Sequence, residues 1–318
     1  MQADILQTPV ALFVFKRPDT TRLVFDAISR ARPAKLLLIA DGPRPDREGE
    51  TEACRQVREI ITAVDWPCEV FTNFADANLG CGERMVSGLN WVFSLVEEAI
   101  LLEDDCLPDP SFFPFCQELL ERFRGDARIA YICGCNLVER YGSIADSYYF
   151  SRIGGIWGWA TWRSEWQRYD RHLSDWPELR KQRKLAEIFD DQKVVEFWTH
   201  IFDVMHEGKG PDTWDYQWLY TGLRNNSLTI VPKTNLIANI GFGEGATHTT
   251  VVDDRVVVPV SSMDFPLKHP SDLVPLRSLD RRRVRDMLPP SILNRIFQKL
   301  RHAAGLLTSR RTDHQAIQ

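Results

Sequence analysis

The sequence predicts an α/β fold built on a mostly parallel, doubly wound sheet, with an α+β portion after it. In the first 135 residues, short apolar runs alternate with segments whose apolar residues recur at helical spacing. Parallel strands need crossovers of helix length, and the helices then cover both faces of the sheet. After about residue 150 this alternation ends, and Trp and Gly become frequent. We therefore expect a regular first half and a less regular second half.

The elements of the first half follow one another in a fixed order. Five apolar runs are expected to be strands: 10–15, 35–41, 68–72, 99–103 and 128–133. Four helices lie between them, with Asp19 expected as the N-cap of the first and Ser111 as the N-cap of the fourth. In the last three helices the apolar residues repeat the same spacing, beginning at Ala53, Met85 and Phe112.

Polar residues follow the predicted strands at four places. Because ligands of such sheets bind beyond the carboxyl ends of the strands, we expect these residues to share one rim. They are Lys16-Arg17, Asp41-Gly42, residues 78–82 and residues 103–105.

The most informative of these places is the acidic end of the fourth strand, Glu103-Asp104-Asp105. Three adjacent carboxylates repel one another unless a positive charge lies among them. A hard divalent cation takes oxygen ligands and keeps positions open for phosphate. A solvated acidic turn at the strand end is the alternative.

Composition and missing motifs exclude several classes of protein. The net charge is −5 and 44% of residues are hydrophobic, so a broad nucleic-acid surface is not expected. No G-x-G-x-x-G, P-loop or G-x-S-x-G motif is present, which disfavours dinucleotide enzymes, P-loop ATPases and α/β-hydrolases. The first apolar run is too short for a secretory signal or a membrane span, and the seven Cys show no metal-type spacing. These features predict a cytoplasmic protein.

Several motifs in order resemble one family. The acidic cluster is preceded by Arg17 and Asp41 and followed by Trp214-Asp215-x-x-Trp218 and by Gly245-x-x-His248. On this strand pattern, the chain resembles the GT-A glycosyltransferases, whose metal site is a D-x-D-type motif. The Glu-Asp-Asp form is similar to that of the N-acetylglucosaminyltransferase I type and of related bacterial surface-polysaccharide transferases. The resemblance implies a GT-A catalytic domain over 1–250.

We expect this domain to consist of a nucleotide-binding half, 1–135, and an acceptor-binding half, 136–250. A C-terminal extension, 251–318, has no counterpart in the resemblance. Its last 38 residues carry nine Lys and Arg against two acidic residues. Residues 291–307 are expected to form a basic amphipathic helix, which either contacts the inner membrane or packs on a protein surface.

The resemblance also implies roles for the donor site. Asp105 is expected to bind Mn²⁺ or Mg²⁺, and His248 to contact the metal or a phosphate. Asp104 would reach the ribose or the waters of the metal, and Glu103 the donor sugar or base. Asp41 is similar to the residue that binds uracil, although it could instead form only the Asp-Gly turn. Arg17 would meet the nucleotide or its phosphates, or be a surface charge.

Transfer with inversion needs a general base for the attacking hydroxyl. Asp215 is our candidate, because it lies between two Trp residues that lower the local polarity; capping of the next helix is the alternative. Trp157 and Trp159 are expected to line the cleft, since flat aromatic faces suit sugar rings, whereas most other Trp residues belong to the core.

The sequence thus predicts a metal-dependent, inverting hexosyl- or N-acetylhexosaminyltransferase of cell-surface polysaccharide synthesis. Its donor would be a UDP- or GDP-sugar, and its acceptor a glycan or a lipid-linked sugar. A sugar-nucleotide pyrophosphorylase is one alternative, although residues 15–18 lack the expected Gly-rich basic loop. A non-catalytic glycan-binding or scaffold protein that retains the fold is the other.

Overall fold

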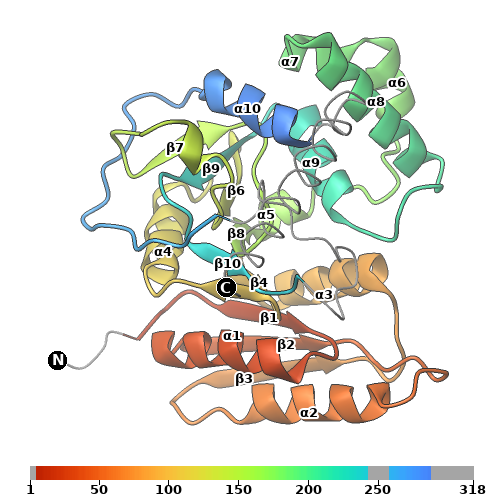
Figure 1. Cartoon of the computed structure of the whole chain (residues 1–318), viewed down its shortest axis with the longest axis vertical. Coiled ribbons are helices and arrows are strands. Elements are labelled where there is room, and N and C mark those ends of the chain that lie inside the picture. Colours follow the sequence, from red (N-terminus) through yellow and green to blue (C-terminus); the bar gives the residue numbers. More distant parts are fainter. Residues whose placement is uncertain (1–4, 243–257, 288–318) are drawn as a thin grey trace, which may run out of the picture.

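The central sheet begins with four parallel strands, as predicted. A computed structural model of the chain describes residues 5–242 and 258–287 (Figure 1). The first strands are β1 (Val10–Val14), β2 (Lys35–Ala40), β3 (Glu69–Phe74) and β4 (Glu98–Glu103). β1 pairs in parallel with β2 and β4, and β2 pairs in parallel with β3. β1 is buried along its whole length because helices cover both faces of the sheet.

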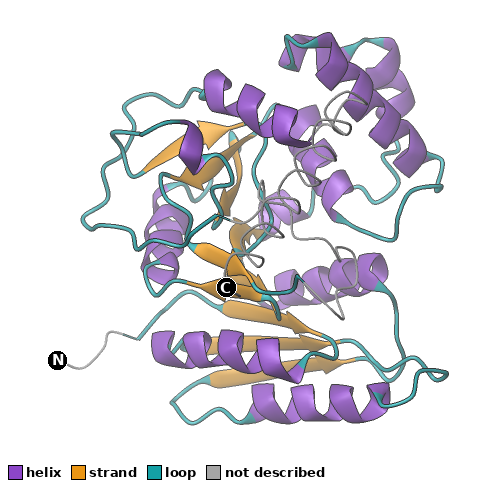
Figure 2. Ribbon diagram, in the orientation of Figure 1, coloured by secondary structure: helices purple, strands orange, loops and turns teal. Residues whose placement is uncertain are grey.

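Three helices connect these strands: α1 (Pro18–Ala31), α2 (Glu50–Thr62) and α3 (Cys81–Leu95). A fourth helix, α4 (Phe112–Arg122), follows β4 in the chain. α1 and α2 pack against each other on one face (Figure 2). α3 returns from β3 to β4 in the opposite direction, so a right-handed crossover places it on the other face. α1 begins at a proline, and its N-cap is Arg17 rather than the expected Asp19. Ser111 is the N-cap of α4, but its side chain makes no capping hydrogen bond.

The second half of the chain extends the same sheet with mixed directions. Its strands are β6 (Ile129–Cys133), β7 (Tyr148–Ser151), β8 (Trp159–Trp162) and β9 (Leu228–Pro232). β8 lies antiparallel between β4 and β6, which completes the order β3-β2-β1-β4-β8-β6-β9-β7. A separate two-stranded sheet pairs β5 (Cys106–Pro108) with β10 (Ile237–Asn239). The predicted class, mixed α/β with a large and mostly parallel sheet, is confirmed.

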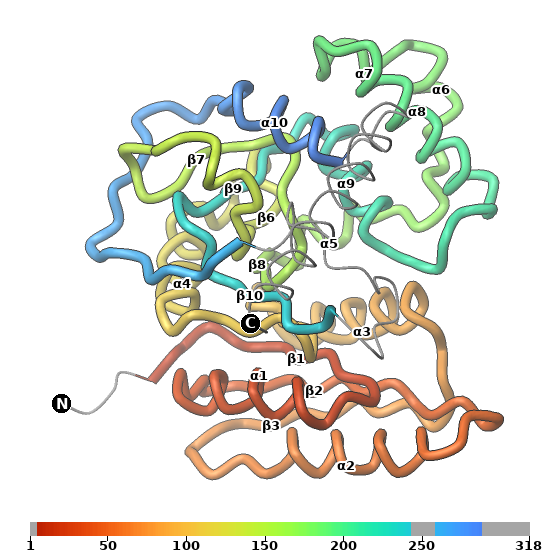
Figure 3. The backbone as a smooth tube through the Cα atoms, in the orientation of Figure 1, coloured from red at the N-terminus to blue at the C-terminus, as the bar shows by residue number. Residues whose placement is uncertain are grey.

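Helices of the second half enclose a smaller, aromatic core. The short segments are η1 (Glu139–Tyr141), α5 (Arg163–Trp166), α6 (Trp176–Lys181) and α7 (Lys184–Ile188). The longer helices are α8 (Gln192–His206), α9 (Asp215–Arg224) and α10 (Arg277–Met287). Trp176, Trp198, Phe202 and Tyr220 are buried together in this second core. The tube in Figure 3 shows that these helices lie apart from the first three strands.

Part of the predicted C-terminal extension packs on the body of the protein. In α10, Leu279 joins the main core and Val284 joins the second core. The basic amphipathic helix expected over 291–307 lies outside the described residues. No helix in the described ranges is both long and apolar enough to cross a membrane. The domain limits at 135 and 250 stay predictions.

Candidate functional site

A cleft of about 740 Å³ opens at the carboxyl ends of β1, β2 and β4. Its other walls come from the segment before β8, from the loop before α9 and from the chain after β10. The cleft therefore lies at the edge of the sheet where parallel strands usually bind their ligands. Seven of the predicted site residues line the cleft: Arg17, Asp41, Glu103, Asp104, Asp105, Trp157 and Asp215.

The acidic end of β4 forms the floor of the cleft. Asp104 is 9% exposed, and its carboxylate accepts a hydrogen bond of 3.2 Å from the backbone N–H of Phe15. Burial, reinforced by the charge of Asp105, raises the pKa of Asp104 to about 7. Burial and the same neighbour raise the pKa of Glu103 well above its usual range. The fold thus holds the Glu103 and Asp104 carboxylates where burial disfavours their charged forms.

Arg17 brings a positive charge to this cluster. The Arg17 guanidinium lies 3.0 Å from the Asp105 carboxylate. The pairing of β5 with β10 closes the other side, where the N–H of Ile240 donates to the Asp105 carbonyl at 2.8 Å. A Cβ added at Gly241 would overlap both the Asp105 carboxylate and the Arg17 guanidinium. Glycine at 241 therefore lets the backbone pass directly over the ion pair.

Asp41 has a structural role at the rim in addition to its place in the cleft. Its carboxylate accepts hydrogen bonds from the N–H of Gly42 at 2.8 Å and of Leu79 at 3.0 Å. The side-chain amide of Asn78 donates to its second oxygen at 2.7 Å. Burial raises the pKa of Asp41. The Asp-Gly turn considered as the alternative is present, and Asp41 also fastens the loop before α3.

Asp215 is the first residue of α9 and faces the acidic cluster across the cleft. It is preceded by the N-cap Trp214, and no side chain caps this helix. The Thr213 hydroxyl donates a hydrogen bond to the Asp215 carboxylate. Three residues before Asp215, the Asp212 carboxylate accepts a 3.0 Å hydrogen bond from the N–H of Gly82 at the start of α3. The capping alternative for Asp215 is wrong, and Asp212 anchors the Asp215 loop to the first half of the chain.

The two tryptophans expected in the cleft have different positions. Trp157 lines the cleft, and its ring meets that of Phe242 edge to face. Trp159 does not line it: it is 1% exposed in β8 and stacks on Trp214 at a centroid distance of 5.4 Å. Its expected position was wrong because the central strand β8 is covered by α9 on this face. His248 lies outside the described residues.

Several residues that line the cleft, among them Arg84, were not predicted from the sequence. This arginine of α3 is 7% exposed, and its guanidinium donates to the Asn73 side chain at 2.8 Å. Burial lowers the pKa of Arg84, and its Nε has no hydrogen-bond partner within the part of the chain that the structure describes. The available signal was an arginine directly before the apolar stripe that begins at Met85.

The donor atoms suit a cation bound together with a diphosphate. In residues 5–242 and 258–287, no three His, Cys, Asp or Glu side chains are arranged as a metal site. Mg²⁺ at nucleotide sites usually takes one or two protein carboxylates, and phosphate oxygens and waters complete its coordination. Asp105, which lines the cleft, can supply one such carboxylate.

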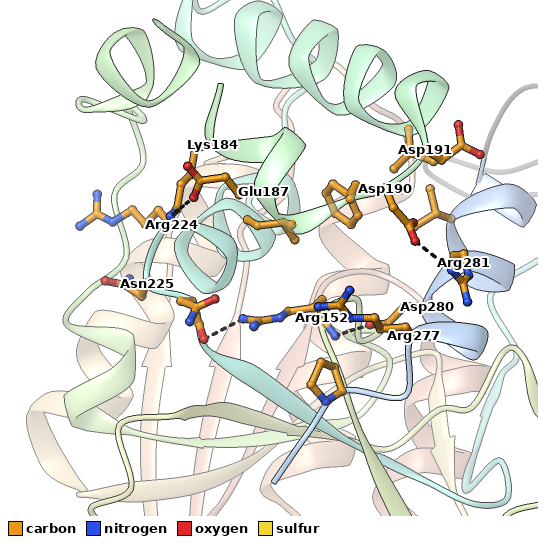
Figure 4. A pocket seen from close by; sticks show the side chains of 16 residues that line it. Arg152, Lys184, Glu187, Asp190, Asp191, Arg224, Asn225, Arg277, Asp280 and Arg281 are labelled. Atoms are coloured by element: carbon orange, nitrogen blue, oxygen red, sulfur yellow. Dashed lines mark hydrogen bonds and ion pairs between the residues drawn. The ribbon is translucent and has the colours of Figure 1, made fainter. Parts of the chain in front are cut away.

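A second polar cavity, of about 390 Å³, lies between α7, α9 and α10 (Figure 4). Its charges largely neutralise one another: Arg281 pairs with Asp190 at 2.8 Å and Lys184 with Glu187 at 2.6 Å. Arg152 donates to the carbonyl of Asn226 at 2.7 Å. The pair of Arg281 and Asp190 joins α10 to the segment between α7 and α8.

No protein-family model matches the chain, and no curated protein matches it. Among solved structures, it is similar to a 4-diphosphocytidyl-2C-methyl-D-erythritol synthase from Anaerococcus prevotii, with 10% identity and a TM-score of 0.33 over 53% of this chain and 77% of that chain. It is also similar to a UDP-glucose pyrophosphorylase complexed with UDP-glucose, with 12% identity and a TM-score of 0.26 over 47% of this chain and 64% of that one. At these scores the likeness says nothing about the activity of this chain.

Proposed function

We propose that the protein is a metal-dependent, inverting glycosyltransferase. It would move a hexose or N-acetylhexosamine from a UDP- or GDP-sugar to a glycan or lipid-linked acceptor of a cell-surface polysaccharide. One observation carries the proposal: the acidic end of β4 with Arg17 and the carboxylate of Asp215 line a single cleft. A diphosphate-binding group and a candidate base are thus available to one bound donor.

On the donor side, Asp105 would hold Mn²⁺ or Mg²⁺, Asp104 would contact the ribose or the waters of the metal, and Glu103 would contact the donor sugar or base. The bound cation would neutralise charge on the diphosphate as it leaves. The Arg17 guanidinium offsets part of the negative charge of Asp105. It would turn toward a phosphate when the donor binds. Asp41 keeps free acceptor capacity for a base N–H, because each carboxylate oxygen has two lone pairs.

On the acceptor side, Asp215 would take the proton of the attacking hydroxyl. The acceptor oxygen then forms a bond to the anomeric carbon while the bond from that carbon to the phosphate oxygen breaks. The nucleoside diphosphate departs with this electron pair. The Thr213 hydroxyl holds the Asp215 carboxylate in place for the proton transfer.

The pairing of two basic side chains near the turn after β1 favours sugar transfer over pyrophosphorolysis. A pyrophosphorylase needs a basic loop for the additional phosphates. Here the Lys16 ammonium is held by Glu50 at 2.6 Å, and the Arg44 guanidinium binds the same carboxylate. Both basic side chains are therefore paired with Glu50, the first residue of α2.

Product analysis tests the proposal and its alternatives. Purified protein is incubated with UDP- or GDP-sugars and Mn²⁺, with and without pyrophosphate. The proposal predicts nucleoside diphosphate as product, through slow hydrolysis or transfer. Nucleoside triphosphate formed only with pyrophosphate would establish the pyrophosphorylase, and no turnover of any nucleotide sugar would support a binding protein.

Two variants separate the proposed roles. Asp215→Asn should lower turnover about 100-fold or more while donor binding is retained. Asp105→Ala should lose Mn²⁺-dependent donor binding and turnover together. Asp65→Asn, at an exposed position between α2 and β3, is the matched control and should behave as the wild type. Equal loss of binding and turnover in Asp215→Asn would contradict its role as base.

A further inference from the structure

A cavity of about 190 Å³ adjoins the cleft on the side of the second core. We call it the aromatic cavity, because five aromatic residues line it: Tyr131, Trp157, Trp198, Tyr216 and Trp218. It shares Trp157, Asp215 and Tyr216 with the cleft. A molecule in the aromatic cavity would therefore lie beside the carboxylate proposed as base.

Two of the tryptophans that line this cavity are buried and carry an unpaired indole N–H among the described residues. Trp198 is fully buried and Trp218 is 2% exposed, yet the indole N–H of each has no hydrogen-bond partner in residues 5–242 and 258–287. Buried donors are paired in the great majority of proteins, since an unpaired one costs about 1–3 kcal/mol. A single water needs only roughly 10–15 Å³, so the cavity has room for a larger ligand. Aromatic walls suit a sugar ring, because its apolar C–H faces pack on flat aromatic rings.

Arg283 of α10 adds a positive charge to the aromatic cavity. It is half-buried, and within the described ranges neither a carboxylate nor another hydrogen-bond acceptor pairs with it. Its neighbours on α10 are engaged: Arg281 pairs with Asp190 at 2.8 Å, and Arg282 lies over the Tyr141 ring at 5.2 Å. Asp280 accepts hydrogen bonds from the Ser151 hydroxyl and the Arg152 N–H instead.

An arginine without a partner at a half-buried position is a strong binding group for an anion. Guanidinium groups bind carboxylates and phosphates through paired, charge-assisted hydrogen bonds. Among the described residues that line the aromatic cavity, Arg283 is the single cation, and Asp215 is the single carboxylate. The cavity therefore offers a base at the end next to the cleft and a cation elsewhere in its wall.

We propose that the aromatic cavity binds the acceptor sugar and that Arg283 selects an acceptor with an anionic group, a carboxylate or a phosphate. This inference rests on the proposed function and adds the chemical class of the acceptor. The sugar ring packs against the aromatic walls with its attacking hydroxyl toward Asp215. The anionic group pairs with Arg283.

Binding of three monosaccharides tests the inference. Dissociation constants of glucuronate, glucose 6-phosphate and glucose are measured by saturation-transfer NMR on the full chain in the presence of UDP and Mn²⁺. At least one anionic sugar should bind about tenfold or more tightly than glucose, as one charge-assisted pair predicts. Tighter binding of glucuronate would identify the anionic group as a carboxylate, and tighter binding of glucose 6-phosphate would identify it as a phosphate. Equal affinity for all three sugars, or no binding of any, would overturn the inference.

Variants of α10 assign the effect to one side chain. Arg283→Gln should remove the preference for the anionic sugar and leave the affinity for glucose unchanged, whereas Arg283→Lys should retain part of it. Arg282→Gln, on the same helix but directed to Tyr141, is the matched control and should keep the preference. An unchanged preference in Arg283→Gln would refute the role of Arg283. UDP binding in the same samples reports separately on the proposed function, because it depends on Asp105 and not on α10.

Discussion

At the scale of single residues, the cleft side chains support the fold and the candidate site together. Asp105 pairs with Arg17, and Asp41 fastens the loop before α3 while it lines the cleft. The sequence could predict that these residues meet, because the carboxyl ends of parallel strands share one edge. It could not predict Asp212 or Arg283, since loops and α10 bring them there through packing. The predicted position of Trp159 was wrong because Trp residues occur both in β8 and in the cleft segment just before it. Composition alone does not distinguish the two.

Glu50 provides a residue-scale prediction about pH. This carboxylate is 4% exposed and binds Arg44 and Lys16, and hydrogen bonds from Arg44 above all lower its pKa to about 2. A lowered carboxyl pKa stabilises the folded state above the unfolded pKa of about 4.3, and this contribution disappears as the pH falls through about 2. Glu50→Gln should therefore lower the free energy of unfolding by about 1–2 kcal/mol at pH 7.

Urea denaturation of both proteins at several pH values measures this difference. It should be constant between pH 6 and 8 and shrink below about pH 4. Glu52→Gln on the same helix is the control, because Glu52 is exposed and its pairing with Arg55 lies on the surface. A difference between wild type and Glu50→Gln that does not change with pH would contradict this account.

At the scale of elements, apolar periodicity located the strands and helices of the first half within a few residues. The expected strand at 68–72 is shifted slightly, to Glu69–Phe74. Periodicity did not reveal β5 and β10, because three-residue strands carry too few positions to show an alternation. The position of β8 inside the sheet was equally hidden, since pairing with β4 is a contact between distant parts of the chain.

The packing of α3 on the sheet gives an element-scale prediction. A Cβ at Gly88 would lie 2.5 Å from the Phe13 ring and 3.0 Å from Ile39. Gly88→Ala should therefore destabilise the protein by about 1–3 kcal/mol through overpacking, despite the better helix propensity of alanine. Gly222→Ala in α9 is the matched control: nothing lies within 4 Å of the added Cβ, so this variant should stabilise by roughly 0.5–1 kcal/mol. Opposite shifts of the melting temperature are expected, and shifts of the same sign would refute this packing.

At the scale of the whole molecule, the cleft lies where the parallel first half meets the mixed second half. The first half supplies Arg17, Asp41 and the acidic end of β4, and the second half supplies Trp157 and Asp215. A ligand that touches both halves should stabilise the folded state by mass action. A free ligand concentration of 100 times the dissociation constant should raise the free energy of unfolding by about 2.7 kcal/mol.

The central claim is that the acidic end of β4 binds a nucleoside diphosphate together with a divalent cation. Isothermal titration calorimetry of UDP and GDP, with Mn²⁺ or with a chelator, tests it most directly. The account predicts that at least one nucleotide binds about tenfold or more tightly with Mn²⁺, and that Asp105→Ala abolishes this difference while Asp65→Asn preserves it. Absence of nucleotide binding, or binding that is the same with and without Mn²⁺, would contradict the claim.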